Sequence, residues 1–370
     1  MKSKFIISGG GTGGHLFPAI AIANEIKNYD ETAEILFVGA KGRMEMTRVP
    51  NAGYNIIGLT IAGFQRQMSL KNLLKNTMFP FKLLWSLISA MIIIKRFKPD
   101  VVIGVGGYAS GPTLKMASFL GVPTLIQEQN SFPGVTNRML AKKANKICVA
   151  YEETNKYFPQ NKMVITGNPI RKDILDIKHK EEQAFKYFKL DPTKKTIAVI
   201  GGSLGSKTMN ISIETCLGKI RENDIQLIWQ TGEKYYSQFF ESDLKITNGG
   251  IKIMPFVDRM DYLYSIADVV VSRAGALSIS ELSCLGKATI LVPSPNVSGD
   301  HQTKNAKVLA DANAAILIKD RHAIDELGNT LLQLINDEKK CEELSNNIKK
   351  FAFPNALKNI VEEIYKLKTK

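Results

Sequence analysis

Long hydrophobic runs, paired cysteines and closely spaced aspartates are all missing from this chain of 370 residues. No stretch reaches the roughly 18 consecutive apolar residues that a membrane-spanning helix needs. The four cysteines are far apart and form no C-x-x-C pair, so they give no hint of a disulfide framework or a metal site and fit a reducing compartment. The apolar part of the opening MKSKFIIS is too short for a signal peptide. We therefore expect a cytoplasmic globular protein, long enough for two domains.

Acidic residues are absent from one long segment, 46–99, of a chain whose net charge is +14. The basic residues of the segment are Arg48, Arg66, Lys71, Lys75, Lys82, Lys95, Arg96 and Lys98. It also contains the apolar run FPFKLLWSLISAMIIIKRF, which is too short to span a bilayer. Basic residues and tryptophan around an apolar face are typical of a surface that binds anionic lipid headgroups, whereas the run alone could be a buried helix with solvated flanks. We expect an anionic membrane surface as a partner, and no nucleic acid, because no nucleic-acid-binding motif is present.

Five glycines, a threonine and a histidine stand between a predicted strand and a predicted helix in KFIISGGGTGGHLFPAIAIA. The apolar run Phe5–Ser8 predicts the strand, and the sequence from Pro18 onward predicts the helix. Glycine lets bare backbone approach a ligand, and a helix N-terminus favours an anion. The anion could be the phosphate of a dinucleotide, a nucleoside triphosphate or a sugar nucleotide.

Two of these ligands fit poorly. Gly9, Gly11 and Gly14 satisfy G-x-G-x-x-G, but the next predicted strand ends in Gly39–Ala40, where a dinucleotide site needs an acidic residue, and Glu45 comes only after a further turn. No G-K-[S/T] follows the glycines, which argues against a nucleoside-triphosphate loop. A purely structural turn stays possible, although it would not need five glycines.

Strand-like runs alternate with helix-sized intervals along the whole chain. The predicted strands of the first half are Phe5–Ser8, Ile35–Val38, Val101–Val105, Thr124–Ile126, Lys146–Val149 and Met163–Ile165. The pattern restarts at KKTIAVIGGSLGSKTMN and continues with Ile225–Gln230, Ile251–Phe256, Val269–Ser272, Thr289–Leu291 and Ala314–Ile318. This alternation predicts an α/β protein of two Rossmann-like domains, whose parallel sheets face a cleft and bind ligands at the carboxyl ends of their strands. We place the domains at residues 1–166 and 167–350, and expect a final helix in 351–370 to pack back on the first domain.

Seven motifs run in order from Gly10 to Ala306: GGTGGHLFPA, GVGGYASGP, QEQN, TGNPIR, GGSLGS, SRAGALSISEL and DHQTKNA. Together they resemble the MurG family, the UDP-N-acetylglucosamine (UDP-GlcNAc) transferases that act on the membrane-bound peptidoglycan precursor. The resemblance implies the GT-B glycosyltransferase fold and an inverting reaction that needs no metal or other cofactor. It also implies transfer to the 4-hydroxyl of a polyprenyl-diphosphate-linked muramoyl-pentapeptide, by a peripheral protein on the cytoplasmic face of the bacterial inner membrane. The absence of any Asp-x-Asp pair fits metal independence.

The resemblance assigns several residues of the second half to the sugar-nucleotide donor. They are Val257, Ala276, Leu277, Ser278, Ile279, Ser280, Glu281 and Gln302. Glu281 would accept the ribose hydroxyls, although a glutamate could instead complement a helix N-terminus. The backbone of Val257 would meet the uracil, unless Val257 is plain core, and Gln302 would bind sugar hydroxyls, unless it caps a helix.

The departing diphosphate needs stabilisation by amides, hydroxyls or fixed cations when no metal is present. The glycine loop Gly201–Ser206 offers such groups, and we expect Ser203 and Asn210 to touch diphosphate or acceptor. Arg171 and Arg273 could supply positive charge, with Arg171 on the donor, although either arginine could equally form a surface ion pair.

His15 is the candidate general base of the first half. It lies beside a predicted helix N-terminus, whose field disfavours protonation, and a neutral imidazole could accept the proton of the attacking hydroxyl. The resemblance gives His15 this role, whereas the alternative is a structural role in holding the loop. Glu128, in QEQN, is the second candidate for the base.

Further residues of the first half are expected to bind the substrates. We assign Thr12, Gly13, Gly14 and Asn130 to the donor and Tyr108 to the acceptor or its diphosphate. Gln127 stands where the MurG family usually has histidine, and because glutamine cannot shuttle a proton we expect it to have a supporting role.

Three other functions stay open from the sequence. A GT-B enzyme that glycosylates another lipid, such as diacylglycerol, would also combine a glycine loop with a membrane face. A sugar-nucleotide epimerase would need no lipid, and a UDP-sugar-binding membrane adaptor would need no catalytic base.

Overall fold

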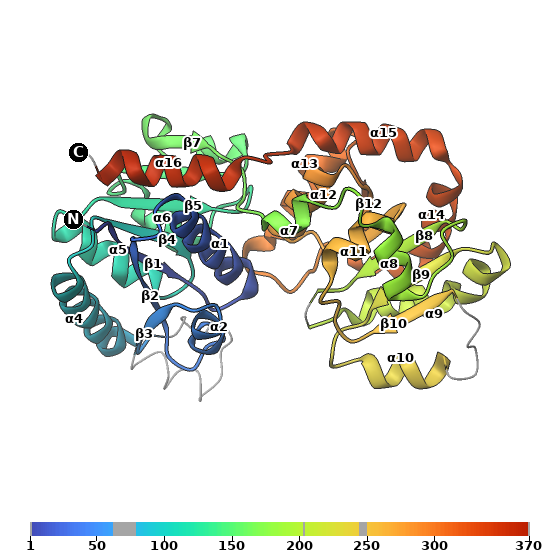
Figure 1. Ribbon diagram of the computed structural model, residues 1–370, viewed down its shortest axis with the longest axis horizontal. Helices are drawn as coiled ribbons and strands as arrows, with labels where there is room; N and C mark the ends of the chain where they lie inside the picture. Colours follow the sequence, from blue (N-terminus) through green and yellow to red (C-terminus); the bar gives the residue numbers. More distant parts are fainter. Residues whose placement is uncertain (1, 62–78, 203, 244–249, 369–370) are drawn as a thin grey trace. The chain divides into compact units, whose positions relative to one another are not determined.

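The computed structural model describes residues 2–61, 79–202, 204–243 and 250–368, and the chain forms two compact units (Figure 1). Unit 1 comprises Met1–Pro169 and Asn355–Lys370, and unit 2 comprises Ile170–Pro354. Residues 167–169, which we had placed with the second half, belong to unit 1 because the Gly167 N–H bonds to the Val149 carbonyl. Residues 351–354 belong to unit 2, where Phe351 packs against the core.

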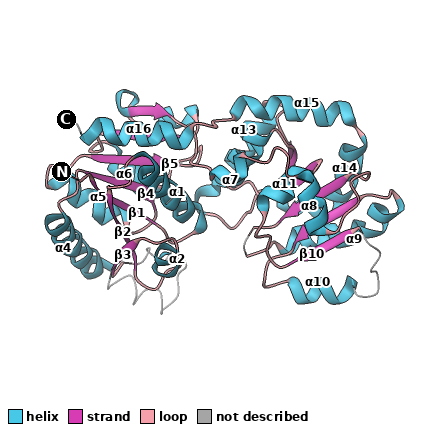
Figure 2. Cartoon of the chain, viewed as in Figure 1, coloured by secondary structure: helices cyan, strands magenta, loops and turns pink. Residues whose placement is uncertain are grey.

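Unit 1 contains one parallel sheet, whose strands are magenta among cyan helices in Figure 2. Among the described residues its strand order is β3-β2-β1-β4-β5-β6-β7. Its strands are β1 (Lys4–Gly9), β2 (Glu34–Ala40), β3 (Asn55–Leu59), β4 (Val101–Gly106), β5 (Thr124–Glu128), β6 (Lys146–Val149) and β7 (Met163–Ile165). The six strands that the sequence predicts in this half are present. The edge strand β3 was not predicted, because NIIGL is short, contains glycine and has only one buried residue, Leu59.

Helices cover both faces of the sheet of unit 1. They are α1 (Gly13–Tyr29), α2 (Glu45–Asn51), α4 (Phe79–Phe97), α5 (Ser110–Phe119), α6 (Val135–Ala141) and α16 (Ala356–Lys368), with short 3-10 turns η1 (Glu152–Lys156) and η2 (Gln160–Lys162). One face packs against α1 and α16, through residues such as Ile22 and Ile360. The other face packs against α4, α5 and α6, through residues such as Ile94, Leu114 and Leu140.

Helix α1 begins at Gly13, and Pro18 lies inside it rather than at its start. Thr12 is the extended N-cap residue, so Gly13, Gly14 and His15 form the first turn. The end of the first glycine loop is therefore helical, and His15 is held by regular backbone.

Unit 2 also contains one parallel sheet, of order β10-β9-β8-β11-β12-β13 within the described part of the chain. Its strands are β8 (Thr196–Ile200), β9 (Gln226–Gln230), β10 (Ile251–Met254), β11 (Val269–Ser272), β12 (Ala288–Leu291) and β13 (Ile316–Leu317). Its helices and 3-10 turns are α7 (Lys172–Leu175), α8 (Glu181–Phe188), α9 (Lys207–Glu222), α10 (Tyr236–Asp243), α11 (Met260–Ile266), α12 (Ala276–Leu285), α13 (His301–Asp311), α14 (Ala323–Asn336), α15 (Glu338–Ile348), η3 (Ser298–Asp300), η4 (Asp320–His322) and η5 (Lys349–Phe351). β10 and β13 are shorter than the sequence predicts.

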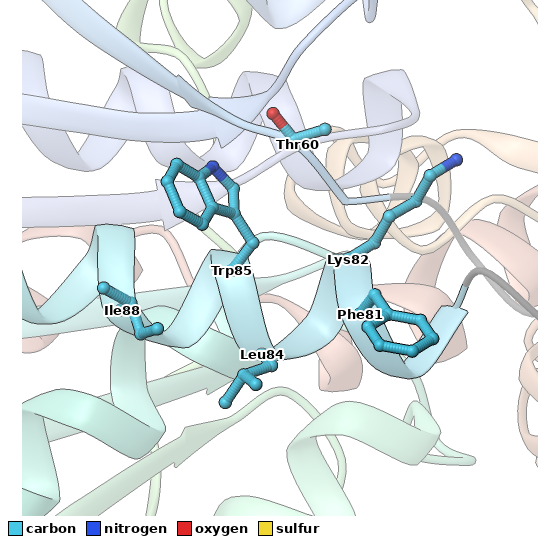
Figure 3. Close-up of a pocket in the computed structure, with 6 residues that line it drawn as sticks. All are labelled: Thr60, Phe81, Lys82, Leu84, Trp85 and Ile88. Carbon is cyan, nitrogen blue, oxygen red and sulfur yellow. The ribbon is translucent and has the colours of Figure 1, made fainter.

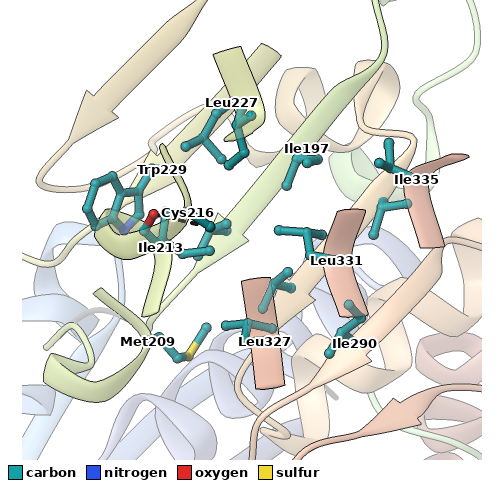
Figure 4. Close-up of a cluster of buried hydrophobic side chains, with 14 of the residues drawn as sticks. Ile197, Met209, Ile213, Cys216, Leu227, Trp229, Ile290, Leu327, Leu331 and Ile335 are labelled. Atoms are coloured by element: carbon teal, nitrogen blue, oxygen red, sulfur yellow. Dashed lines mark hydrogen bonds between the residues drawn. The ribbon is translucent and has the colours of Figure 1, made fainter. Parts of the chain in front are cut away.

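The core of unit 2 lies on both faces of its sheet. On one face the side chains of β8 and β9, including the fully buried Trp229, pack against α9 and α14 (Figure 4). On the other face Ala198 and Ile228 pack with residues of α8, α11 and α12. Burial of these apolar side chains is the main favourable contribution to folding of the unit.

Strand order reverses at one point in each sheet, between β1 and β4 in unit 1 and between β8 and β11 in unit 2. Ligands of doubly wound sheets bind outside the carboxyl ends of the strands at such a point. The two glycine loops, Gly9–Gly14 and Gly201–Ser206, follow β1 and β8, so each unit has a glycine loop at its expected binding edge.

Candidate functional site

The first glycine loop is hydrogen-bonded to the buried carboxylate of Glu45. Glu45, at the start of α2, is buried and accepts hydrogen bonds from the N–H groups of Gly11 at 2.9 Å and Ala40 at 3.0 Å. Sequence reasoning considered Glu45 only as a ribose ligand and missed this role. The Gly11 amide is therefore engaged within the protein, which leaves the first turn of α1 as the part of the loop suited to an anion.

The loop after β4 approaches the glycine loop so closely that side chains are excluded. Gly106 and Gly107 both have positive φ, +97° and +91°. A Cβ atom on Gly107 would lie 2.3 Å from the Gly10 carbonyl oxygen, and one on Gly106 would lie 2.8 Å from Cε1 and Nδ1 of His15. The glycines of GVGGYASGP thus let the backbone of this loop pack against the histidine ring.

His15 is partly exposed on the first turn of α1, beside buried amide side chains. Its Nδ1 lies 3.0 Å from Oε1 of Gln129, which follows β5. Gln129 was within the motif QEQN but was given no role from the sequence, because a buried glutamine has no signature in one sequence. The neighbouring loop residues Thr12, Gly14 and Tyr108 are exposed and could contact a substrate.

Glu128 is buried, and its carboxylate accepts hydrogen bonds from the residues that follow it in the chain. One carboxylate oxygen accepts hydrogen bonds from the backbone N–H and side-chain amide of Asn130, at 3.0 and 3.2 Å. The other accepts from the Gly134 N–H at 3.0 Å and the Asn137 side chain at 2.9 Å. This arrangement suits a residue that shapes the loop, and it favours His15 over Glu128 as the candidate base.

The second glycine loop is connected to the end of β11 through Arg273. The Arg273 guanidinium donates to the carbonyl oxygens of Val292 and Pro293 at 3.0 Å, pairs with Asp320, and donates to the Ser206 hydroxyl. Because both partners of the Arg273–Asp320 pair are mostly buried, this arginine holds the loop rather than offering an exposed charge.

Asn210 lies inside the core rather than on the loop. Its amide donates to the Thr231 carbonyl and its oxygen accepts from the Trp229 indole N–H, both at 3.0 Å. With the side chain fully buried, the geometry gives no support to the expectation that Asn210 touches a diphosphate. Ser203 lies outside the described residues.

Helix α12 places Glu281 beside a buried tyrosine. Tyr264 donates its hydroxyl to Glu281 Oε2 at 3.0 Å. Loss of solvent raises the pKa of the Glu281 carboxyl to about 7, although the hydrogen bond from Tyr264 and the charge of Arg171 act in the opposite direction. Glu281 lies in the second turn of α12, so it is not placed to complement the N-terminus of this helix.

Other donor candidates of unit 2 differ in how far their polar groups already have partners within the protein. Arg171 is exposed and only loosely paired with Asp173, at 3.7 Å. Gln302 accepts a hydrogen bond from the Ser294 N–H at 2.8 Å, which leaves its NH2 group to donate to a sugar. The Val257 N–H donates to Gln230 Oε1 at 3.0 Å, so a base that meets this residue would use its carbonyl group.

The first turn of α12 contains Ala276, Leu277 and Ser278. It follows β11 directly, contains no acidic residue, and has no side-chain cap at Gly275. Such a helix end favours an anion. Ile279 is buried, whereas Ser280 donates to the Ala276 carbonyl within the helix.

An apolar stripe, which we define as Phe81, Leu84, Trp85, Ile88 and Ile92, lies on the exposed side of α4. Phe81 is 73% exposed and Trp85 62% exposed. Phe81, Leu84, Trp85 and Ile88 line a pocket together with Thr60 and Lys82 (Figure 3). The opposite side of α4 is core, since Ala90 and Ile94 are buried. Arg66, Lys71 and Lys75 of the acid-free segment lie outside the described residues.

Neither a metal site nor a membrane span is found in the part of the chain that the structure describes. No group of three His, Cys, Asp or Glu residues there could hold a metal ion. None of the helices described is long and apolar enough to cross a bilayer.

Comparison with known proteins gives near-complete matches. The models of the glycosyltransferase family 28 N-terminal and C-terminal domains match residues 5–149 and 196–360. A curated relative from Flavobacterium psychrophilum is named UDP-N-acetylglucosamine–N-acetylmuramyl-(pentapeptide) pyrophosphoryl-undecaprenol N-acetylglucosamine transferase. It is 53% identical over 366 residues, which cover 98% of this chain and 97% of the relative.

The chain belongs to the MurG family. A second relative with the same name, from Parabacteroides distasonis, is 53% identical over 99% of this chain and 98% of its own length. A crystal structure of MurG from Acinetobacter baumannii superimposes with a TM-score of 0.78 at 28% identity, covering 99% of this chain and all of that one. The MurG resemblance and the GT-B fold class expected from the sequence are thereby confirmed.

Proposed function

We propose that this protein transfers N-acetylglucosamine from UDP-GlcNAc to the 4-hydroxyl of undecaprenyl-diphospho-N-acetylmuramoyl-pentapeptide, with inversion and without a metal. The observation that carries the proposal is the 53% identity, over nearly the whole chain, to relatives named for this transfer. These relatives favour the transferase over the epimerase and the diacylglycerol-type enzyme, and an activity of this kind makes the protein a hexosyltransferase.

Unit 1 supplies the base in this proposal. His15 accepts the proton of the 4-hydroxyl as the oxygen attacks the anomeric carbon from the face opposite the diphosphate. The new oxygen–carbon bond forms while the bond from that carbon to the diphosphate oxygen breaks, and UDP leaves with the electron pair. Thr12 and the first turn of α1 bind phosphate or sugar close to His15 in the chain.

Unit 2 holds the donor in this proposal. Glu281 accepts the two ribose hydroxyls, the first turn of α12 stabilises the diphosphate, and Gln302 donates to the sugar. Arg171 supplies an exposed cation, whereas Arg273 maintains the shape of the loop. Helix amides and an arginine replace the metal that other sugar-nucleotide transferases use.

The experiment that tests the function is transfer of labelled N-acetylglucosamine from UDP-GlcNAc to a short-chain lipid-diphospho-muramoyl-pentapeptide in the presence of EDTA. Label in the lipid product supports the reaction, the acceptor and metal independence together. Transfer that EDTA abolishes would contradict metal independence, and transfer only to diacylglycerol would contradict the acceptor. Formation of an epimeric UDP-sugar without lipid would contradict the transferase.

Donor affinity is expected to rise with pH. Below about 7 Glu281 is mostly protonated and can accept fewer hydrogen bonds, whereas above its raised pKa the carboxylate can accept both ribose hydroxyl protons. The Kd for UDP-GlcNAc should therefore fall about tenfold between pH 6 and pH 8, because the ionised fraction rises by about that factor. Calorimetric titration at both pH values measures this change. The Glu281→Gln variant should bind weakly at both, and an equal pH dependence in that variant would assign the effect to another group.

We further propose that the protein attaches peripherally to the cytoplasmic face of the inner membrane through the apolar stripe of α4. Exposed aromatic and aliphatic side chains can enter the headgroup region, while Lys82 and the basic end of α4, Lys95 and Arg96, attract anionic lipid.

Binding to vesicles that contain phosphatidylglycerol is expected, with release at high salt, since screening weakens the attraction. The Trp85→Ser variant should bind several-fold more weakly in a vesicle sedimentation assay, because a large apolar surface no longer enters the interface. Ile324→Ser, at an exposed apolar position of unit 2, is the matched control and should bind like the parent protein. Equal loss in both variants, or binding insensitive to salt, would refute this mode of attachment.

A further inference from the structure

A chain of three buried amide side chains leads from His15 into unit 1. Gln129 contacts the histidine, Gln127 contacts Gln129, and Asn168 contacts Gln127. All three amides are at least 99% buried. Buried amides must match donors to acceptors, so the orientation of each side chain constrains the next.

The direction of Gln129 is fixed by a main-chain carbonyl. Its amide approaches the carbonyl oxygen of Val105, at the end of β4, to 2.9 Å. A carbonyl can only accept, so the end of the side chain that faces Val105 must be the NH2 group. The other end, which faces His15, is therefore the oxygen Oε1.

The far end of the chain gives the same direction independently. The Asn168 amide donates to the main-chain carbonyl of Gln129 at 3.0 Å, so the Asn168 side-chain oxygen faces Gln127. Gln127 donates its NH2 group to that oxygen at 3.2 Å. Its own oxygen then accepts from the NH2 group of Gln129. The carbonyls of Val105 and Gln129, at opposite ends of the amide chain, thus require the same orientation of its side chains.

We propose that Gln129 is a positioning residue that selects the tautomer of His15 with the proton on Nδ1. Because Oε1 of Gln129 can only accept, Nδ1 must donate across the 3.0 Å contact, and Nε2 of a neutral ring then carries the lone pair. This inference rests on the proposed function, in which the lone pair of Nε2 accepts the proton of the acceptor hydroxyl. It adds Gln129, with Gln127 and Asn168 behind it, to the residues on which the reaction depends.

Gly106 lies against the edge of the His15 ring that carries Nδ1. A Cβ at this position would lie 2.8 Å from both Nδ1 and Cε1 of His15, so the backbone at the end of β4 packs directly against the ring. The ring is therefore restrained by backbone packing and by the amide.

The amide chain contains no group that titrates. A carboxylate in the place of Gln129 would also accept from Nδ1, but its charge would stabilise the imidazolium, so a smaller share of the ring would be unprotonated and able to accept a proton at neutral pH. An amide selects the tautomer without adding charge.

Nitrogen-15 NMR of the full-length protein labelled at histidine tests the proposal. The chain has four histidines, and the signals missing from the His15→Ala variant identify those of His15. We expect a protonated Nδ1 and an unprotonated Nε2 in the neutral ring. A proton on Nε2 in the parent protein would overturn the proposal whether or not any variant folds, and whether or not transfer is observed.

The Gln129→Met variant removes the acceptor at nearly constant size. Its His15 signals should show a mixture of tautomers, and its kcat should fall about tenfold with little change in the KM for UDP-GlcNAc, because a smaller share of the protein holds the reactive ring form. The exposed Gln160→Met change in the same unit is the control and should alter neither property. An unchanged tautomer in Gln129→Met, or a loss of activity carried wholly by KM, would also overturn the proposal.

Discussion

Replacing His15 with alanine is expected to lower kcat by a factor of about 10²–10⁴, the usual contribution of a positioned general base. The change removes the only group on the first turn of α1 that can accept a proton near neutral pH. Donor affinity should stay near that of the parent protein, because the donor ligands that we propose on Glu281 and α12 lie in unit 2. Transfer kinetics, together with calorimetric titration of UDP-GlcNAc, measure both properties.

The partly exposed His322 provides a matched control, because His322→Ala removes an imidazole from a surface turn of unit 2. It should leave kcat unchanged. If His15→Ala retained more than a third of the parent kcat, the base would have to be another group. If His15→Ala lost donor affinity in parallel with kcat, its role would be in binding rather than in proton transfer.

The Gly107→Ala variant is expected to lose about 3 kcal/mol or more of folding stability. The positive φ of +91° costs an alanine about 1–2 kcal/mol on its own, and the added methyl would lie 2.3 Å from the Gly10 carbonyl oxygen, so the two loops would have to separate. Activity should fall as well, because the displaced Gly10 precedes the turn that carries His15. Urea denaturation of the full chain, followed by circular dichroism, measures the loss of stability.

Gly121, directly after α5, separates the two contributions. It also has positive φ, +75°, but nothing lies within 4 Å of the Cβ that an alanine would add. Gly121→Ala should therefore show only the conformational part, about 1–2 kcal/mol, with normal kcat. Equal losses of folding stability in the two variants would mean that the close approach of the loops at Gly107 does not add to the cost of the substitution.

The sequence predicts the sheets well because parallel strands buried on both faces read as continuous apolar runs. VVIGV and TIAVI are of this kind, and both form fully buried strands. β3 was not predicted because an edge strand with a single buried residue lacks that signal. The start of α1 was placed too late, since Pro18 reads as a first-turn residue although the helix admits it in its second turn.

The sequence allows a candidate site residue to be selected when its side-chain type alone suggests a role. It does not show which of these side chains are already engaged by other residues of the protein. His15 and Glu281 could be selected as a base and a diol acceptor, and their placement is consistent with those roles. Arg273 and Asn210 carry the same functional groups as ligands would, but a partner far away in sequence, Asp320 or Trp229, occupies each of them. A single sequence does not contain such pairings. The chain of amides that leads from His15 could not be predicted from the sequence for the same reason. The orientation of its side chains depends on contacts with two main-chain carbonyls.

The fold of unit 1 also bears on how the protein is made. Helix α16 completes the core around Phe5 and Ile22, and its Tyr365 packs edge-on against Phe5, with ring centroids 5.4 Å apart. The ribosome releases this helix only after every residue of unit 2, so the nascent first half waits with one face of its sheet incompletely covered while Ile170–Pro354 is synthesised. Unit 2 is continuous in the chain and can finish folding first, and the half that carries His15 becomes complete last.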